Sequence, residues 1–478
     1  MIKVFKFDET YIRIECDDSI AQELSEHFSF MVPNARWMPS FKNKLWDGKI
    51  RLFNTRNRRL YAGLRQQVEQ FCKSRDYEYE EEPDFAADSF SISEAKDWIK
   101  TQDFSLQPRD YQIDAFCKGI RNRRALFLSP TASGKSFIIW LLTAYLRERT
   151  LIVVPTTSLV SQMAKDFVEY SPGTEVHQIY SGKEKQTDKL ITITTWQSIY
   201  KMDKKWFNNY KVIIGDEAHL FKANSLTSIM EKTVNVPYKF GFTGTLDGSL
   251  TNKMVLEGLF GPVDRVITTT ELMERKDVAN LRIKCIVLEY PDMDRQTMRG
   301  SSYQDEVDYI VTHSGRNKFI ANLANSLEGN VLVLFRYIEK QGDVLAGLIK
   351  AKAGERSGVY YVTGGVEAET RERVRTLVDS QQRAIIVASF GVFSTGINIK
   401  NINYIILASP AKSRITVLQS IGRGLRKSET KSDAVWFDIA DDLSWKSYKN
   451  HTIKHYAERI KIYNDENFSY KQYKVKIK

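Results

Sequence analysis

The chain has 478 residues, of which 42% are hydrophobic and 27% charged, and its 70 Lys and Arg residues outnumber 59 Asp and Glu residues to give a net charge of +11. This composition supplies enough apolar side chains for a buried core, so wholesale disorder is excluded. The longest apolar run is far shorter than the ~18 residues that a membrane-spanning helix needs. We therefore expect a cytoplasmic protein without a membrane segment, and the basic surplus favours a polyanionic partner.

The spacing of Cys and His excludes two further classes. The four cysteines lie far apart in the sequence, and no two of them stand in C-x-x-C spacing. Of the six histidines, only His451 and His455 lie near each other in the sequence. These patterns argue against a disulfide framework and against a zinc site, and they fit a reducing compartment.

Residues 1–88 predict a small, basic α+β domain that accompanies a larger structure. Two β-rich runs, residues 4–7 and 11–15, precede an amphipathic helix over residues 20–28. The acidic, aromatic stretch 76–84 that closes this region predicts a linker or a solvated surface.

A basic segment within this domain, residues 34–66, predicts a nucleic-acid-binding surface. Asp47-Gly48 tolerates the backbone angles of a tight turn, so the runs 44–46 and 49–53 predict a β-hairpin. Nine Lys and Arg residues face one acid in the segment, and aromatic side chains that can stack on bases lie between them. The alternative is that the aromatics form a small core and the charges a solvated face. The candidate contacts in the hairpin are Lys44, Lys49 and Arg51.

The region from residue 89 to residue 442 predicts two successive α/β units. Short apolar runs alternate with helical patterns, which is typical of a doubly wound parallel sheet covered on both faces. We expect a first lobe over 89–275, a second lobe over 276–442 and a basic, helical C-terminal tail over 443–478. The predicted strands are residues 124–128, 151–154, 190–194, 212–215 and 239–242, and then 331–335, 359–362, 384–388, 404–407 and 434–437.

A phosphate-binding loop is predicted at Ser129–Ser136, between a strand and a helix. Backbone N–H groups and the positive end of the helix bind phosphate oxygens in such loops. Lys135 is placed to reach the β- and γ-phosphates, and the Ser136 hydroxyl to bind Mg²⁺. The alternative is an ordinary helix-capping turn. The other candidate phosphate contacts are Thr131, Ser133 and Gly134.

Two carboxylates follow a buried strand about eighty residues later, in Ile213-Ile214-Gly215-Asp216-Glu217-Ala218-His219. ATP hydrolysis needs one carboxylate for the Mg²⁺ shell and another group that orients the attacking water. Asp216 suits the first role and Glu217 the second. The alternative is an acidic pair that caps the next helix.

The tetrad Asp216-Glu217-Ala218-His219, together with the loop at 129–136, resembles the nucleotide site of superfamily-two helicases and translocases of the DEAH type. The resemblance implies two tandem RecA-like lobes and an ATP hydrolase coupled to nucleic-acid unwinding. It also implies ATP and Mg²⁺ as cofactors, with Ser136 and Asp216 as protein ligands of the metal.

Other motifs of that family have counterparts in the first lobe. Arg109 and Gln112 resemble the Q-motif, in which the glutamine reads the adenine edge. The resemblance implies strand contacts from Thr156, Thr157 and Thr195. It implies that His219, Thr243 and Thr245 couple hydrolysis to motion.

The second lobe carries the later motifs. Arg336, Ser389 and Thr395 resemble strand-contacting positions, and Gly396 and Asn398 resemble nucleotide-linked ones. Gln419, Arg423 and Arg426 resemble the last motif, whose arginines act on the nucleotide held by the first lobe. Because Arg423 and Arg426 stand three residues apart on a predicted helix, we expect their guanidinium groups on one face.

Two positions depart from the family pattern. Ala132 stands where the phosphate loop usually has glycine, and Asn398 where an aspartate is usual. Alanine still presents its backbone N–H, so we expect hydrolysis to survive, whereas Asn398 loses a charge and its role is left open.

Within this family, the compact chain and the run from Trp46 to Leu52 look most like the UvsW-type helicases of tailed bacteriophages. That resemblance implies unwinding or branch migration of forks, Holliday junctions and R-loops in recombination, repair and replication. The expected partners are single-stranded and branched DNA and RNA–DNA hybrids, bound by a monomer in the host cytoplasm. Three alternatives stay open: an RNA helicase, the motor subunit of a restriction or repair complex, and a nucleotide-gated clamp without hydrolysis.

Overall fold

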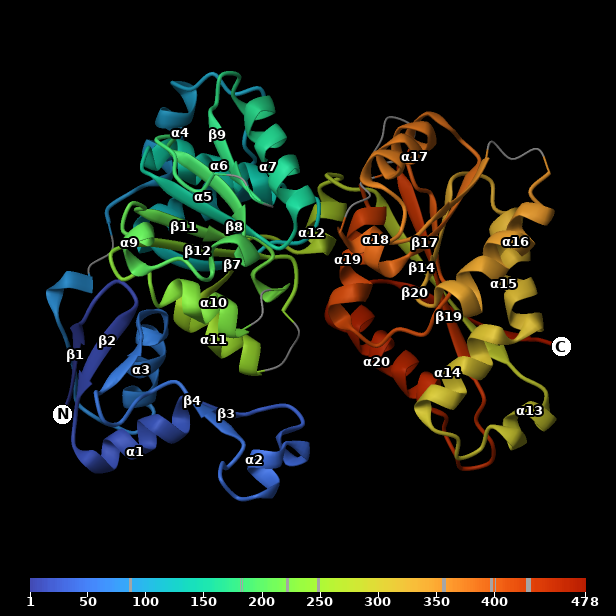
Figure 1. The fold of residues 1–478 in the computed structure, drawn as a ribbon, viewed down its shortest axis with the longest axis horizontal. Helices are drawn as coiled ribbons and strands as arrows, with labels where there is room; N and C mark the ends of the chain where they lie inside the picture. The colour runs from blue at the N-terminus through green and yellow to red at the C-terminus, as the bar shows by residue number, and fades with distance from the viewer. Residues whose placement is uncertain are drawn as a thin grey trace. The chain divides into compact units, whose positions relative to one another are not determined.

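The computed structural model describes residues 1–85, 88–180, 182, 184–220, 223–246, 250–354, 358–395, 399, 401–426 and 431–478. The chain divides into two compact units, residues 1–129 with 134–266 and residues 130–133 with 267–478 (Figure 1). The first unit contains the N-terminal domain and the first lobe. The second unit contains the second lobe and the C-terminal segment.

The N-terminal domain is built on a four-stranded sheet in the order β5-β2-β1-β6. Alternate residues of β1 and β2 point to one side of this sheet and bury their apolar side chains with α1 and α3. The acidic stretch 76–84, expected to be a linker or a solvated surface, contains β6, which pairs in parallel with β1. The elements are β1 (Ile2–Lys6), β2 (Tyr11–Glu15), α1 (Asp18–His27), β5 (Arg59–Tyr61), η2 (Ala62–Leu64), α3 (Arg65–Lys73), β6 (Tyr79–Glu81) and η3 (Pro83–Phe85).

A separate two-stranded extension, residues 29–51, is called the arm below. The predicted hairpin around Asp47-Gly48 is wrong in its partner strand, because β4 pairs with β3 and not with residues 44–46. Lys44 adopts a left-handed backbone angle (φ 56°), which breaks any extended run there, and the Trp46 indole donates to the Lys49 carbonyl at 2.8 Å. The arm contains β3 (Ser29–Met31), η1 (Ala35–Trp37), α2 (Pro39–Lys42) and β4 (Lys49–Arg51).

The first lobe is a seven-stranded parallel sheet in the order β13-β7-β12-β11-β8-β10-β9. Successive residues of its buried strands supply two different cores, one under α4–α7 and one under α9–α11, so helices cover both faces (Figure 1). The strands are β7 (Arg124–Leu128), β8 (Thr150–Val154), β9 (Val176–Ile179), β10 (Ile191–Thr195), β11 (Val212–Gly215), β12 (Tyr238–Thr243) and β13 (Val263–Arg265). The helices are α4 (Ile92–Lys100), α5 (Asp110–Asn122), α6 (Lys135–Leu146), α7 (Thr157–Tyr170), α8 (Trp196–Ile199), α9 (Lys204–Phe207), η4 (Ala218–Leu220), α10 (Ala223–Met230) and α11 (Leu250–Phe260).

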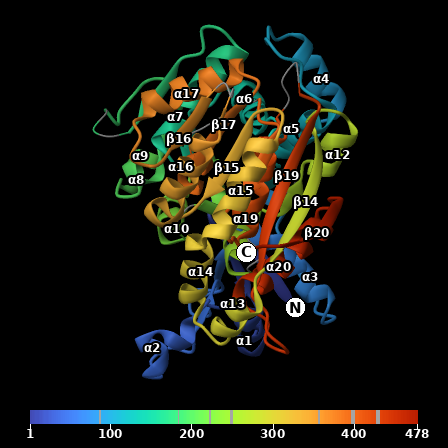
Figure 2. The ribbon, with the colours of Figure 1, turned by 90° about the vertical axis from the view of Figure 1, so that its right-hand side faces the viewer.

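The second lobe is also a seven-stranded parallel sheet, in the order β16-β17-β15-β18-β19-β14-β20 (Figure 2). The C-terminal segment contributes α20 and the edge strand β20, which pairs with β14. The strands are β14 (Asn280–Glu289), β15 (Val331–Phe335), β16 (Gly358–Val362), β17 (Ala384–Ser389), β18 (Tyr404–Leu407), β19 (Asp433–Asp442) and β20 (Tyr470–Lys476). The helices are α12 (Thr269–Glu274), α13 (Asp292–Thr297), α14 (Tyr303–Thr312), α15 (Ser314–Ser326), η5 (Ile338–Gly342), α16 (Asp343–Ala351), α17 (Ala368–Ser380), α18 (Phe390–Thr395), α19 (Arg414–Gly424) and α20 (His451–Asp465). The prediction of an α/β protein with two doubly wound lobes and a small N-terminal α+β domain is confirmed.

The N-terminal domain is fixed to the first lobe by specific polar contacts. The hydroxyls of Tyr11 and Tyr61 both donate to Glu231 Oε1 at 2.8 Å. Gly63 lies so close to the backbone carbonyl of Glu257 in α11 that a side chain at this position would collide with it. Such close backbone packing couples the N-terminal domain to the first lobe as one compact unit.

Candidate functional site

The candidate nucleotide site lies at one edge of the first-lobe sheet. Because the strands are parallel, their carboxyl ends share this edge, where ligands bind in open α/β sheets. The phosphate loop follows β7, and the Asp216–His219 tetrad follows β11. Strand β12 lies between them, so its last residue, Thr243, stands between the loop and the tetrad.

The predicted phosphate loop contains two residues with left-handed backbone angles. Gly134 has a φ of 79°, and a side chain there would collide with the amide of Gln112. Gln112 is buried and accepts a hydrogen bond from the Arg109 N–H at 2.9 Å through its Oε1. Ala132 also has a positive φ, 70°, an angle that an alanine adopts only with some strain. Helix α6 begins at Lys135, so its N-terminal N–H groups face the loop.

Lys135 and Glu217 form the central ion pair of this edge. Lys135 Nζ donates to Glu217 Oε1 at 2.6 Å, and both side chains are largely buried. Asp216 is 7% exposed, and its Oδ1 accepts a hydrogen bond from the Glu217 N–H at 2.9 Å. Burial raises the pKa of Asp216 to about 6, an effect that Lys135 opposes and Glu217 reinforces. The structure therefore brings together the three residues that the sequence predicts for catalysis in this lobe.

Ser136, the predicted metal ligand at the start of α6, contacts a residue that the sequence did not indicate. Its hydroxyl lies 2.7 Å from that of Tyr170, the last residue of α7. Burial raises the pKa of Tyr170 to about 12. No sequence motif marks Tyr170, because its position depends on how α7 packs on α6.

The three predicted coupling residues form a hydrogen-bonded chain. His219 Nδ1 lies 2.5 Å from Thr243 Oγ1, and the Thr243 hydroxyl donates to the Thr245 carbonyl at 2.6 Å. A threonine hydroxyl has a single proton, so His219 Nδ1 is the donor in its bond with Thr243. The tetrad is thereby connected to the end of β12.

The predicted strand-contacting threonines of the first lobe differ in what their hydroxyls contact. Thr156 caps α7 and lies 3.0 Å from the Ser158 hydroxyl, while Thr157 is exposed. Thr195 is buried and lies 2.9 Å from the Ser198 hydroxyl. The Thr156 hydroxyl thus acts as the N-cap of α7.

The last motif of the second lobe lies only partly on a helix. Gln419 and Arg423 are on α19, but this helix ends at Gly424, so Arg426 lies beyond it. The expectation that both arginines share one helix is wrong, because α19 ends at Gly424, two residues before Arg426. All three predicted side chains are half-buried.

The other predicted positions of the second lobe lie at strand and helix ends. Arg336 follows β15, is exposed, and donates its backbone N–H to Ser409 Oγ at 2.9 Å. Ser389 ends β17 and is buried, and Thr395 is the last residue of α18. Gly396 and Asn398 lie outside the described residues.

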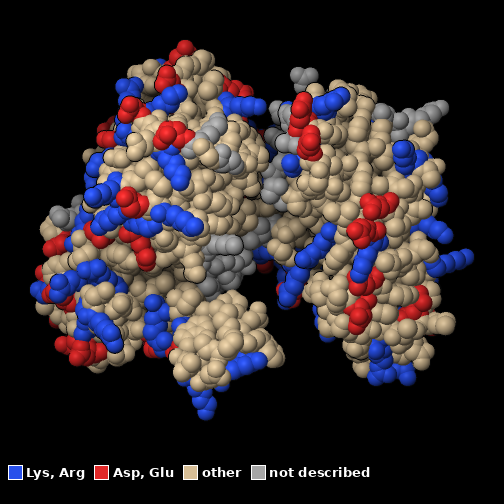
Figure 3. Space-filling view, viewed as in Figure 1, with Lys and Arg blue, Asp and Glu red and all other residues tan. Residues whose placement is uncertain are grey.

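The arm presents apolar and basic side chains together. Trp37 is 68% exposed and Leu45 81%, and Figure 3 shows a mostly uncharged surface there with basic side chains at its edge. Lys49 and Arg51 are ion-paired to Glu26, at 2.5 and 2.6 Å, and Arg51 also to Asp47 at 2.7 Å. Within the described residues, Lys44 makes no ion pair. The aromatic side chains of segment 34–66 are likewise of two kinds. Trp37 is exposed on the arm, whereas Phe53 and Tyr61 are buried in the domain core.

The described residues contain neither a His, Cys, Asp and Glu metal cluster nor a membrane-spanning helix. In the ranges given above, no group of three or more His, Cys, Asp and Glu side chains could hold a metal ion. Over the same ranges, no helix combines the length and apolar character required to cross a bilayer.

Three protein families match successive parts of the chain. Residues 1–80 match the family described as DNA helicase UvsW, N-terminal. Residues 105–248 match Type III restriction enzyme, res subunit, and residues 315–428 match Helicase conserved C-terminal domain.

Individual relatives agree with these matches. The chain is similar to the DNA 3'-5' translocase XPB2 of Sulfurisphaera tokodaii, with 24% identity over 68% of this chain and 80% of the relative. It is similar to the crystal structure of T4 UvsW, with 35% identity, 99% of each chain covered and a TM-score of 0.53. The ATP-dependent DNA helicase uvsW of Enterobacteria phage T4 is 38% identical over 98% of both chains. The chain therefore belongs to the UvsW family of ATP-dependent DNA helicases.

Proposed function

We propose that this helicase uses ATP hydrolysis in the first lobe to unwind or branch-migrate forks, four-way junctions and R-loops. The observation that carries the proposal is the arm, which exposes Trp37 and Leu45 beside unpaired positive charge on a domain fixed to the motor lobe. Such a surface suits DNA whose bases are unstacked at a branch point. Membership of the UvsW family supports the same assignment.

The nucleotide site supports a defined order of events. ATP brings negative phosphate oxygens to the loop, where they compete with Glu217 for Lys135. Once Lys135 binds phosphate, Glu217 Oε1 becomes available to orient the attacking water. Gln112 lies against the loop at Gly134, a position consistent with contact to the adenine edge.

The donor set also fits Mg²⁺. This ion is usually held by one or two carboxylates together with substrate phosphates, and it prefers oxygen ligands. Asp216 and Ser136 supply a carboxylate and a hydroxyl, and bound Mg²⁺ neutralises charge that develops on the phosphates.

We assign the transmission of hydrolysis to His219 and Thr243. Their short hydrogen bond connects the tetrad to the end of β12, and Thr243 continues the connection to Thr245. His219 Nδ1 also lies 3.6 Å from Glu217 Oε2, so a change at Glu217 has a route to the neighbouring strand.

For the second lobe we propose that Gln419, Arg423 and Arg426 act on ATP while it is bound, before each round of hydrolysis. Arginines stabilise charge on a transferring phosphoryl group and accelerate such steps by roughly 10³–10⁵-fold. Cycles of closure and release then move the lobes along a strand. The strand contacts assigned to this movement are Thr156, Thr157, Thr195, Arg336, Ser389 and Thr395.

At a branch point, the arm is the proposed contact with the duplex. Trp37 stacks on an unpaired base, a contact that contributes about 1–3 kcal/mol. Lys44 neutralises a neighbouring phosphate, while Lys49 and Arg51 support the arm through Glu26. The protein works in this proposal as a monomer on its substrate.

One experiment tests the proposal as a whole. ATPase and unwinding rates are measured on single-stranded, forked, four-way and RNA–DNA hybrid substrates, with wild type and with Trp37→Ala. We expect branched substrates to give the highest rates, and Trp37→Ala to slow unwinding of branched DNA while leaving ATPase on single strands unchanged. Equal rates on all substrates, or preferential stimulation by RNA, contradicts the proposal.

A matched variant controls for the arm's stability. Phe53→Leu alters a buried aromatic of the same domain and leaves the exposed surface intact. We expect it to change thermal stability but not the ranking of substrates.

A further inference from the structure

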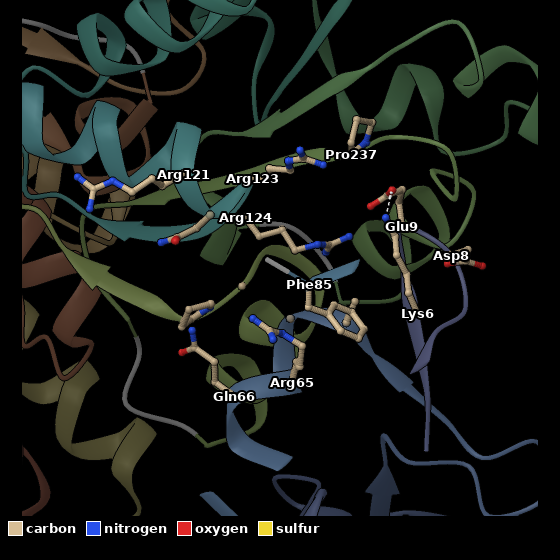
Figure 4. A pocket seen from close by; sticks show the side chains of 15 residues that line it. Lys6, Asp8, Glu9, Arg65, Gln66, Phe85, Arg121, Arg123, Arg124 and Pro237 are labelled. Atoms are coloured by element: carbon tan, nitrogen blue, oxygen red, sulfur yellow. Dashed lines mark hydrogen bonds and ion pairs between the residues drawn. The ribbon is translucent and has the colours of Figure 1, made fainter. Parts of the chain in front are cut away.

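A pocket of about 120 Å³ lies where the N-terminal domain meets the first lobe. Its walls come from β1 and the turn after it, from η2 and α3, and from the turn between α5 and β7 (Figure 4). Arg124, the first residue of β7, lines the pocket, whereas the phosphate loop follows the last residue of this strand. At about 3.3 Å per residue the strand separates the two places by roughly 13 Å, so the pocket is not part of the ATP site.

The pocket is rich in positive charge. Five of its lining residues are basic and two are acidic. Most of the basic ones have protein partners: Lys6 pairs with Glu9 at 2.6 Å, Arg123 pairs with Asp88 at 2.6 Å, and Arg65 pairs with Glu81. Arg121 donates from Nε to the Phe90 carbonyl at 2.8 Å.

The acids that line the pocket are engaged in the same way. Asp8 accepts the backbone N–H groups of Thr10 and Tyr11 at 2.6 and 2.9 Å through its Oδ1. Glu9 is held by Lys6. Neither carboxylate forms an ion pair with an arginine of the pocket in the described part of the chain.

Arg124 is the exception among these residues. Its Nη1 makes one long bond, 3.4 Å, to the Leu259 carbonyl, and its Nη2 is buried with no hydrogen-bond partner. Figure 4 shows this side chain extending between Phe85 and Glu9 into the pocket. Leaving a buried charged donor unsatisfied costs several kcal/mol unless another group compensates it.

A second buried cation lies beside Arg124. Lys239 on β12 is paired in register with Arg124 on β7, and its side chain is fully buried. Its Nζ donates to Thr10 Oγ1 at 2.8 Å, which is a neutral acceptor. Burial lowers the pKa of Lys239 well below its usual value, and the charge of Arg124 adds to the effect. The neighbouring acids, Asp8 and Glu9, therefore do not fully offset the positive potential at this end of the sheet.

We infer that this pocket binds a phosphate group, with the Arg124 guanidinium as its principal donor. A volume of 120 Å³ holds about four water molecules at ~30 Å³ each, which suits one phosphate group. It is below the roughly 300 Å³ at which small-molecule pockets begin, so a whole nucleotide does not fit. The phosphate is either free inorganic phosphate or a phosphodiester of bound DNA.

The test compares the midpoint of thermal unfolding in inorganic phosphate buffer with that in chloride buffer at equal ionic strength. The parent protein is the chain without any substitution in the pocket. All proteins carry Lys135→Ala, which weakens phosphate binding at the ATP site and leaves any remaining contribution of that site the same in every protein. A ligand that binds only the folded state raises its stability, so we expect phosphate to raise the midpoint of the parent protein. Arg124→Gln should abolish this rise. Arg121→Gln, which changes a lining arginine already bonded to the Phe90 carbonyl, should retain it.

Two further measurements complete the test. Arg124→Lys keeps the charge and should retain part of the response, so the inference can be judged even if Arg124→Gln does not fold. Junction binding without ATP, measured against salt, separates the two sources. A DNA phosphodiester in the pocket predicts that Arg124→Gln lowers the slope of log affinity against log salt by about 0.9, whereas free phosphate predicts no change. An equal midpoint rise in parent and Arg124→Gln, or no rise in either with an unchanged slope, overturns the inference.

Discussion

The two ends of the first-lobe sheet differ in how they balance charge. At the carboxyl ends of the strands, Lys135 and Glu217 neutralise each other at 2.6 Å before any nucleotide binds. At the amino ends, Arg124 is half-buried with its Nη2 enclosed, and Lys239 beside it is fully buried. Within the described residues neither forms an ion pair with a carboxylate. The same sheet therefore holds one balanced site and one with excess positive charge.

This difference indicates how each end responds to an anion. At the balanced end, phosphate has to displace a carboxylate, and that displacement frees the group that orients water. At the other end an anion displaces no protein partner and only relieves an existing electrostatic cost. We therefore expect anion binding to trigger chemistry at the first end and to change stability at the second.

Lys135→Ala breaks the balanced pair and is expected to have the largest effect. Without the ammonium group, charge on the γ-phosphate is no longer stabilised, and ATP turnover should fall by roughly 10²–10³-fold. Phosphate release at saturating ATP and DNA measures the change. Lys118→Ala is the control, because Lys118 pairs with Asp114 and Asp264 on the first lobe and should leave turnover unchanged. Turnover of Lys135→Ala within a few-fold of wild type contradicts the assignment.

Glu217→Gln breaks the same pair from the other side. The amide does not act as a general base, so we expect turnover to stall while ATP still binds. Lys135 then loses a competing charged partner worth about 1.5 kcal/mol, so ATP should bind roughly tenfold more tightly. Titration with a fluorescent ATP analogue measures the affinity. Weaker binding than in wild type is inconsistent with the balanced pair described here.

The balanced end was predictable from sequence because its residues stand in contiguous motifs. Ser129–Ser136 and Asp216–His219 directly follow buried strands, and a parallel sheet brings the carboxyl ends of its strands to one edge. Predicted strands such as 124–128 and 331–335 coincide with β7 and β15, since short apolar runs of about four to eight residues bounded by turns are typical of buried strands. The order of the strands, and so the place of Thr243 between the two motifs, required the structure.

The amino end was not predictable for the opposite reason. Its residues come from separate segments, and Arg124 and Lys239 read in sequence as the polar edges of apolar strands. The prediction for the arm was wrong for a similar reason. Asp47-Gly48 indicated a turn, but the sequence did not show that β4 pairs with β3. Edge strands such as β6 and β20 depend on pairing with a distant segment, which local patterns do not reveal.

Lys239→Met tests the amino end directly. Replacing this buried lysine, whose Nζ donates to the Thr10 hydroxyl, by an apolar side chain of similar length should raise the free energy of unfolding at pH 7 by roughly 1–4 kcal/mol in chloride buffer. The pKa of Lys239 is lowered in the folded state, so between that pKa and ~10.4 the unfolded chain binds more protons. Wild-type stability should therefore rise with pH through this window, and the rise should be smaller in Lys239→Met. Urea unfolding at pH 7 and pH 9.5 measures the free energy of unfolding of both proteins and its change with pH. An equal change in wild type and Lys239→Met contradicts a lowered pKa of Lys239.

The arm extends the comparison of paired and unpaired charge to the surface, with the smallest expected effect. Lys44→Gln removes an exposed charge without an ion-pair partner in the described structure, and should lower the slope of log junction affinity against log salt by about 0.9. Glu26→Gln with Lys49→Gln removes a paired anion and cation together, keeps the net charge, and should leave the slope unchanged. Basal ATPase should be unchanged in both, because neither site contacts the nucleotide edge. If the double substitution lowers the slope as much as Lys44→Gln does, ion pairing does not decide which charges of the arm bind DNA. The difference between paired and unpaired charge at the two ends of the sheet then does not extend to this surface.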